Sequence, residues 1–270
     1  MRKNFKILAL FSLLMIGLPI YGTGQIPDMM IYKNNSYSLI GYPLFQYPKK
    51  SQVDPDSMFN GEGCRSTGNY RRYVATWLIE DDMLYLSKIA NGCYGFGSVN
   101  QVEYADLSKV FPQAFENGEV FADWFSGLLY CPYGRIVFAN YYQEVISYEK
   151  EIELNIQNGK LIGKRILDNS KSRQIPYDTL DNGNYIDSKI NWAIIPKIPG
   201  GEVRVRLQFS SNDEGIVDDV KVYPVRGDVF ENEAIRIVKT LPGNVQIFHG
   251  ELMRFHWYMT VRFKESSRKR

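Results

Sequence analysis

Side chains that could carry acid–base, metal or nucleophilic chemistry are sparse in this sequence of 270 residues. Its two histidines, His249 and His256, stand seven positions apart with no cysteine beside them, so hydrogen-bonded or solvated roles are favoured over a metal site. Three carboxylates, Asp123, Glu149 and Glu153, could pair as the acid and base of a glycosidase, but carboxylates on strands are more often solvated. No GxSxG, HExxH or phosphate-loop motif occurs. We therefore expect no enzymatic activity, no catalytic residue, no metal and no cofactor.

The three cysteines, Cys64, Cys93 and Cys131, allow at most one intramolecular disulfide. Cys64 precedes an expected strand and Cys93 follows the next strand of the same hairpin, which makes this pair the most plausible bridge. The alternative is three buried thiols, since free cysteine is commonly buried. No C-x-x-C spacing occurs, and this argues against a zinc ribbon or a thioredoxin-like site.

The first residues have the pattern of an export signal. Arg2, Lys3 and Lys6 precede an apolar run over 7–20, and small residues follow. We expect residues 1–24 to be a cleaved signal peptide and the protein to be periplasmic; an uncleaved inner-membrane anchor is the alternative. The formal charge of the whole chain is +2, from 32 basic and 30 acidic residues. Without the three basic residues of the signal, 29 basic side chains stand against 30 acidic ones, a net charge of −1 that argues against nucleic acid as a partner.

Residues 25–167 are expected to form a β-rich domain of unknown function. Runs of aromatic and β-branched residues alternate with turn signals, and Asn158-Gly159 supplies the positive φ angles of a tight hairpin. A short helical turn is expected at 105–111, before Pro112. The expected strands are 70–79, 83–89, 120–130, 136–142, 151–156 and 161–167.

Residues 168–184 are polar and aperiodic, as expected of a linker. A second domain, 185–264, then shows a different pattern, and a basic tail, 265–270, ends the chain. Strands are expected at 203–209, 216–223 and 252–263. Between the second and third strands, Asp228 and Glu231 favour a helix start, and Pro242-Gly243 ends that helix. The fold class is therefore α+β, a β-rich domain followed by a small β-β-α-β domain.

Residues 191–263 resemble the C-terminal domain of the TonB family, in the variant found in envelope proteins of the Bacteroidetes type. In that family two strands joined by a Gly-containing turn precede a helix with a Glu-Ala-hydrophobic pattern and a following Pro. The matching positions here are Gly215, Val217, Val220, Glu233, Ala234, Val238 and Pro242. Gly243-Asn244 stands where the family often has Trp and Pro. The stretches YRRYVATWLIEDDMLYL and VFADWFSG are similar to segments of uncharacterised bacterial proteins, a resemblance that implies no activity.

The TonB resemblance implies protein–protein recognition in the periplasm, in which an extended segment of an outer-membrane transporter adds as a strand to the domain. The segment from Arg254 to Arg262 is the expected edge, with Phe255, Trp257, Met259 and Val261 on one face. The expected partner-binding residues on the other face are Arg254, His256, Tyr258, Thr260 and Arg262. The alternative is a well-packed terminal strand with a polar outer face. An energy transducer would also need a membrane anchor and a long extended linker, so a TonB-like module attached to another domain is the better description.

Another class of function is a structural or glycan-binding envelope protein without a role in transport. Aromatic rings on a β surface can stack on sugars, and such a site would expose Tyr70, Tyr73, Trp77 and Trp124 together. The alternative, which we favour, is that these rings form the core of the sheet.

Overall fold

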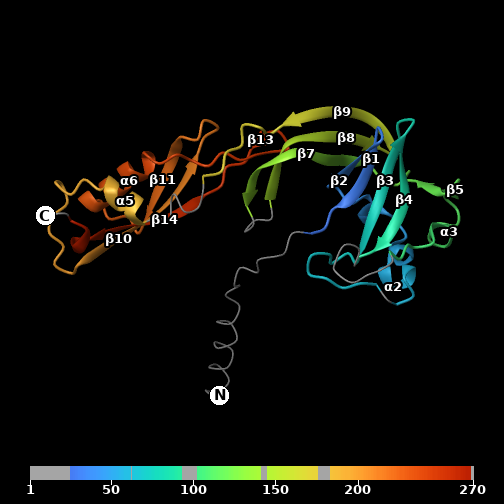
Figure 1. The fold of residues 1–270 in the computed structure, drawn as a ribbon, viewed down its shortest axis with the longest axis horizontal. Helices are drawn as coiled ribbons and strands as arrows, with labels where there is room; N and C mark the ends of the chain where they lie inside the picture. Colours follow the sequence, from blue (N-terminus) through green and yellow to red (C-terminus); the bar gives the residue numbers. More distant parts are fainter. Residues whose placement is uncertain (1–24, 62, 93–101, 141–144, 176–182, 269–270) are drawn as a thin grey trace, which may run out of the picture.

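The computed structural model describes residues 25–61, 63–92, 102–140, 145–175 and 183–268. The expected signal peptide and Cys93 lie outside these residues. Two bodies lie at opposite ends of the molecule, and the long strands of the first body reach toward the second (Figure 1). The protein is strand-rich and mixed, in agreement with an α+β fold.

The first body is one large sheet. Its elements are β1 (Asp28–Tyr32), β2 (Asn35–Leu39), η1 (Pro43–Gln46), η2 (Lys50–Val53), α2 (Pro55–Met58), β3 (Tyr73–Glu80), β4 (Met83–Asn91), α3 (Leu107–Val110), β5 (Phe115–Glu116), β6 (Glu119–Phe121), β7 (Gly127–Asn140), β8 (Val145–Gln157) and β9 (Lys160–Asp168). The strand order is β2-β1-β3-β4-β9-β8-β7, with β6 against β4 and β5 against β6. The pairs are antiparallel except for β1–β3. Ile40 and Tyr130 exchange two backbone hydrogen bonds, of 2.9 and 3.0 Å, so the end of β2 meets β7 and the sheet closes on itself.

Four of the expected strands and the tight turn of the first body are found, although the ends of the strands differ. Expected strands 70–79 and 83–89 correspond to β3 and β4, and 151–156 and 161–167 to β8 and β9. Asn158 and Gly159 have φ angles of 48° and 76° at the turn between β8 and β9. A Cβ at position 159 would lie 2.7 Å from the carbonyl oxygen of Ala122, so only glycine fits there.

The expected division into strands 120–130 and 136–142 is wrong. Residues 119–121 form the short strand β6, and β7 is one strand of 14 residues from Gly127 to Asn140. The pairing of β7 with β8 shifts register around Gly134, whose φ is 84°. This irregularity is a bulge within one strand rather than a break between two.

A buried ion pair joins β1 to the chain entering β3. The Asp28 carboxylate, fully buried, accepts hydrogen bonds from Arg71 at 2.5 Å, from the Ala75 amide at 3.1 Å and from the Trp77 indole at 3.1 Å. Burial raises the pKa of Asp28, although the Arg71 guanidinium opposes the shift. Trp77 is fully buried beside this carboxylate. The aromatic residues of β3 therefore form the core of the sheet.

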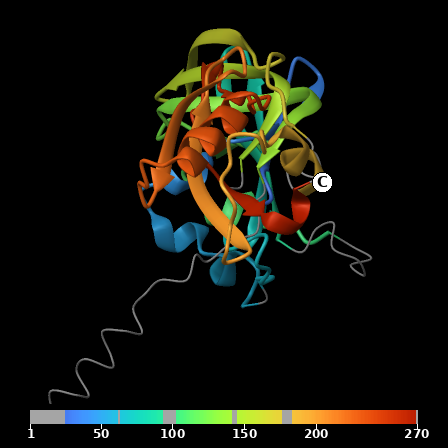
Figure 2. The same cartoon turned by 90° about the vertical axis from the view of Figure 1, so that its left-hand side faces the viewer.

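The second body, here called the C-terminal module (185–264), is a three-stranded antiparallel sheet with helices on one face. Its elements, with those that flank them, are α5 (Gly183–Lys189), β10 (Glu202–Ser211), β11 (Val217–Tyr223), α6 (Val229–Lys239), β12 (Ile247–Phe248), β13 (Glu251–Leu252), β14 (Trp257–Lys264) and η3 (Glu265–Ser267). The sheet order is β11-β10-β14, and β12 pairs with β13 in a separate small hairpin. The helices lie together on one side of this sheet, in front of the large sheet in the end-on view (Figure 2). The most buried side chains between helix and sheet are Val205, Leu207, Ala234, Ile237, Val238, Val261 and Phe263.

The expected helix and its start are confirmed. The Asp228 carboxylate accepts from the Glu231 amide at 2.9 Å, and the Glu231 carboxylate accepts from the Gly227 amide at 2.8 Å. Asp228 is therefore the N-cap of α6, and the Glu231 side chain reaches back to the amide of the residue before the N-cap rather than to the N-cap amide of a capping box. The helix ends at Lys239, just before Pro242.

The expected single strand over 252–263 is wrong at its start. Leu252 ends β13, residues 253–256 are irregular, and β14 begins at Trp257. The chain must cross here from the β12–β13 hairpin, which contacts the first body, to the sheet of the second.

Within the expected linker, Arg173 exchanges two backbone hydrogen bonds with Val245, of 2.7 and 2.9 Å. Two segments of chain are therefore paired where they pass between the bodies.

Among the residues that the structure describes, no helix is long and apolar enough to cross a membrane.

Glu233, at the second turn of α6, is an acidic residue in the core of the C-terminal module. It is 1% exposed and accepts hydrogen bonds from the Asn191 amide at 2.6 Å and from Arg236 at 2.7 Å. Burial alone would raise the pKa of Glu233, but the hydrogen bonds from Arg236 and Asn191 outweigh it and hold the pKa below 4.5. A lowered pKa means that the ionised form stabilises the fold.

We expect Glu233→Ala to lower the free energy of unfolding by about 2–3 kcal/mol at neutral pH, because the Asn191 amide loses its acceptor. The difference from wild type should shrink as the pH falls below 4.5, where the carboxylate is increasingly protonated in the unfolded chain and then in the folded one. Urea titrations at pH 7 and under acidic conditions measure it. The exposed Glu214→Ala is the control; an equal loss in both variants would contradict the assignment.

Candidate functional site

The last strand of the C-terminal module has one free edge. Within the described part of the chain, β14 pairs with β10 alone. The amide of Glu265 donates to the carbonyl of Gly201 at 2.9 Å, which fixes the phase of the ladder. Hydrogen-bonded and non-hydrogen-bonded pairs alternate between antiparallel strands. The backbone groups of the odd-numbered residues therefore face β10, and those of Tyr258, Thr260 and Arg262 point to the free edge.

The side chains of β14 alternate as expected from Trp257 onward. Val261 is fully buried beneath the helices, and Trp257 and Met259 are half-buried on the same face. Tyr258, Thr260 and Arg262 are exposed on the other face, Tyr258 by 75%. Three of the five expected partner-binding residues thus present both an exposed side chain and outward backbone groups.

The other two expected residues, Arg254 and His256, precede the strand. Both side chains are exposed in the irregular stretch 253–256. Arg254 forms an ion pair with Asp218 at 3.0 Å. Their inclusion in the edge strand is wrong, because this stretch spans the gap between the bodies.

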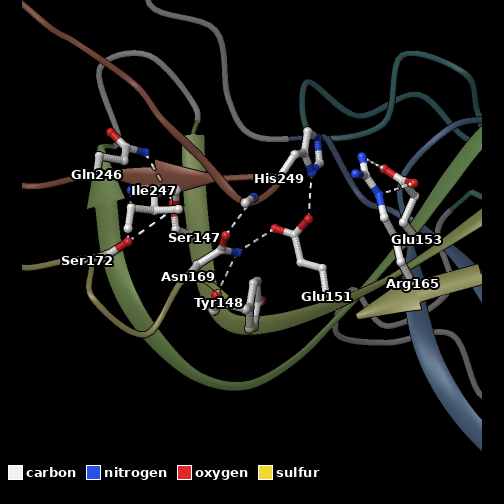
Figure 3. A network of polar contacts seen from close by, with 11 residues as sticks. Ser147, Tyr148, Glu151, Glu153, Arg165, Asn169, Ser172, Gln246, Ile247 and His249 are labelled. Carbon is white, nitrogen blue, oxygen red and sulfur yellow. Dashed lines mark hydrogen bonds and ion pairs between the residues drawn. The ribbon is translucent and has the colours of Figure 1, made fainter. Parts of the chain in front are cut away.

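A second polar centre lies where the β12–β13 hairpin contacts β8 and β9 (Figure 3). The Glu151 carboxylate is 1% exposed and contacts His249 Nδ1 at 2.5 Å through one oxygen. Its other oxygen accepts from the Asn169 side-chain amide at 3.0 Å. Asn169 also accepts from the Gly250 amide at 2.9 Å, so a single buried cluster holds the tip of the hairpin.

The same hairpin is fixed further along by Ser172 and Gln246. The Ser172 hydroxyl accepts from the Ile247 amide at 2.9 Å and lies 3.2 Å from its carbonyl. Gln246, 2% exposed, donates to the Ser147 hydroxyl at 3.4 Å. Tyr130 stacks on the ring of His249 with centroids 3.6 Å apart. These contacts are those of a structural joint between the two bodies.

Two of the three carboxylates considered for acid–base chemistry face arginines. The Glu153 carboxylate accepts two hydrogen bonds from the Arg165 guanidinium, at 2.6 and 2.8 Å, and this pairing raises the pKa of Arg165 (Figure 3). Glu149 lies 3.6 Å from Arg135. Asp123 is exposed. In the described residues, no cluster of three or more His, Cys, Asp or Glu side chains could hold a metal ion.

The aromatic residues proposed for glycan stacking do not form one exposed cluster. Tyr73 and Trp77 are buried, and the Trp124 indole donates to the Pro43 carbonyl at 3.2 Å. Tyr70 alone of the four is highly exposed, at 61%. The interpretation of these rings as mainly core residues agrees with this arrangement.

The structure shows the state of two of the three cysteines. Cys64 is disulfide-bonded, whereas Cys131 is a buried free thiol whose pKa burial raises to about 12. Cys93, the expected partner of Cys64, lies outside the described residues, so the pairing stays a prediction.

Sequence reasoning missed the roles of Glu151, Asn169 and His249. Each residue is ordinary in its local context, and they meet only because a segment nearly a hundred positions away returns to β8. The positive φ of His249, 53°, is equally a product of the fold. No known protein family, curated protein or solved structure matches this chain.

We expect Glu151→Ala to lower the free energy of unfolding by about 2–3 kcal/mol, because the Asn169 amide keeps only its hydrogen bond to the Tyr148 carbonyl and His249 loses its contact with the buried carboxylate. Amide hydrogen exchange at Gly250 should also accelerate as the hairpin detaches. Urea titration and exchange measured by mass spectrometry test both effects. Glu251→Ala, at an exposed position of the same hairpin, is the matched control. If both variants behave alike, the buried cluster does not hold the hairpin.

Proposed function

We propose that this is an exported envelope protein whose C-terminal module binds an extended segment of another envelope protein by β-strand addition to β14. A segment of an outer-membrane transporter is the expected class of partner. The observation that carries the proposal is the free edge of β14, where the backbone groups of Tyr258, Thr260 and Arg262 point outward and have no strand partner among the described residues. Main-chain hydrogen bonds from such an edge supply affinity, and alternate side chains supply selectivity.

The resemblance of residues 191–263 to the TonB C-terminal domain supports this proposal. The order β11-β10-β14, with α6 between β11 and β14 in the chain, suits a domain that keeps its last strand available at an edge. The basic and apolar pattern of residues 1–24 supports export to the periplasm. A folded sheet occupies residues 28–168, where an energy transducer would have an extended linker, so we propose partner recognition without energy transduction.

The other edge of the same sheet is less suitable for pairing. β11 carries Asp218, Asp219 and Lys221 in a strand of seven residues, and charged residues discourage addition of a strand. Asp218 is further engaged by Arg254, and Ile216, just before the strand, forms a bridge with Pro242. We therefore assign recognition to β14.

Tyr258→Pro should abolish binding of the partner segment, because it removes one outward N–H without removing a hydrogen bond to β10. Tyr258→Thr is the matched control, since it removes the same ring and keeps the N–H. To measure binding, a photo-crosslinking residue replaces Thr260, and each variant is irradiated with envelope proteins that retain their extended segments. The crosslinked product is then quantified. Loss of the crosslinked product in the proline variant alone supports strand addition.

Hydrogen exchange provides a readout for the bound state. On binding, the amides of Tyr258, Thr260 and Arg262 should become protected, whereas those of Met259 and Val261 are already paired with β10. The assignment of β14 as the binding edge would be contradicted if the proline and threonine variants bound equally well. It would also be contradicted if the amides protected on binding lay outside β14.

A further inference from the structure

The face of the C-terminal sheet opposite its helices is rich in positive charge. Arg204 and Arg206 on β10 and Arg262 on β14 are all exposed on this face. Arg204 lies directly opposite Arg262 in the register, and Arg206 lies opposite Thr260. Like charges opposite one another on neighbouring strands destabilise a sheet.

The charges on this face are only partly compensated. Arg204 pairs with Glu202 at 2.8 Å, and this hydrogen bond lowers the pKa of Glu202. In the residues that the structure describes, neither Arg206 nor Arg262 forms an ion pair. Each can therefore take an anionic partner without breaking an ion pair within the described part of the chain.

The same face extends across the sheet from β14 to β11, the opposite edge. On β11, the exposed Lys221 lies opposite Gln208 and forms an ion pair with Asp219 at 3.8 Å, and the exposed Tyr223 lies opposite Arg206. A strand added to β14 would run about 4.8 Å from it and would place alternate side chains beside Tyr258, Thr260 and Arg262. Those side chains would be within reach of the long guanidinium groups.

We propose that the segment bound at β14 is acidic on alternate positions, with its carboxylates on the open face of the sheet against Arg262 and Arg206. This inference rests on strand addition at β14 and adds the chemistry of the partner. Two planar guanidinium groups that form no ion pair among the described residues favour carboxylates that can be bound in a bidentate manner. The exposed ring of Tyr258 offers an adjoining surface for an aliphatic or aromatic side chain of the same segment.

The test uses the full exported chain and two short fluorescent peptides, one alternating Glu and Val and the other alternating Gln and Val. Fluorescence anisotropy should show that the Glu peptide binds about tenfold more tightly at low ionic strength, with most of this preference lost in about 1 M salt. The double variant Arg206→Gln/Arg262→Gln should bring the two affinities within about twofold of one another. Arg135→Gln/Lys239→Gln removes two exposed charges from other surfaces and should keep the preference.

The outcomes separate the two proposals. Equal binding of the peptides, abolished for both by Tyr258→Pro, would overturn the acidic partner and leave strand addition intact. A preference for Glu that Tyr258→Pro does not weaken would overturn strand addition. Binding to phosphatidylglycerol vesicles without binding of either peptide would overturn the peptide partner in favour of a lipid surface.

Discussion

The requirement that backbone N–H and C=O groups be hydrogen-bonded governs both ends of this protein. The first body meets it by closing its sheet, since Ile40 and Tyr130 join the strands at its two ends. The C-terminal module has only three strands, too few to close, so it has two edges. One edge carries charged side chains along a short strand, and the other, β14, keeps three outward backbone positions next to exposed side chains. An unprotected edge is a hazard for aggregation in a protein that has no use for it. Its retention here is consistent with the recognition role proposed above for the module.

The position of that edge depends on the joint between the bodies. The β12–β13 hairpin belongs in sequence to the second body but is held against the first by the Glu151 carboxylate. Since β14 begins only five residues after this hairpin, the hairpin fixes where the strand can start. The paired backbone of Arg173 and Val245 adds a second restraint at the same crossing. A partner strand on β14 would therefore lie on a module tethered at two points rather than on a freely swinging one.

The sequence predicted the features that depend on neighbouring residues. Asn158-Gly159 favours positive φ angles through its own residue types, and the Asp228 N-cap on the Glu231 amide needs only one turn of helix. The long strand β14 was placed correctly from Trp257 onward, because its alternation is local, but its start was misplaced. That start depends on where the preceding hairpin docks, and the docking depends on Glu151 and Asn169. No local pattern distinguishes a buried glutamate on β8 from a solvated one, so the joint could not be predicted.

Within the module, the buried charge of Glu233 and the exposed charge of Arg262 have different surroundings, and these indicate different roles. Glu233 has its hydrogen bonds satisfied by Arg236 and Asn191, as expected of a residue that stabilises the fold. Arg262, in contrast, faces another arginine across the ladder and forms no ion pair in the described part of the chain, although its charge contributes to lowering the pKa of Glu202. Natural sequences tend to be consistent at every level, and departures concentrate at functional sites. The departure here lies on the strand whose backbone is also unpaired. Two independent shortages, of hydrogen-bond partners and of negative charge, therefore coincide along β14, and one acidic extended segment would meet both.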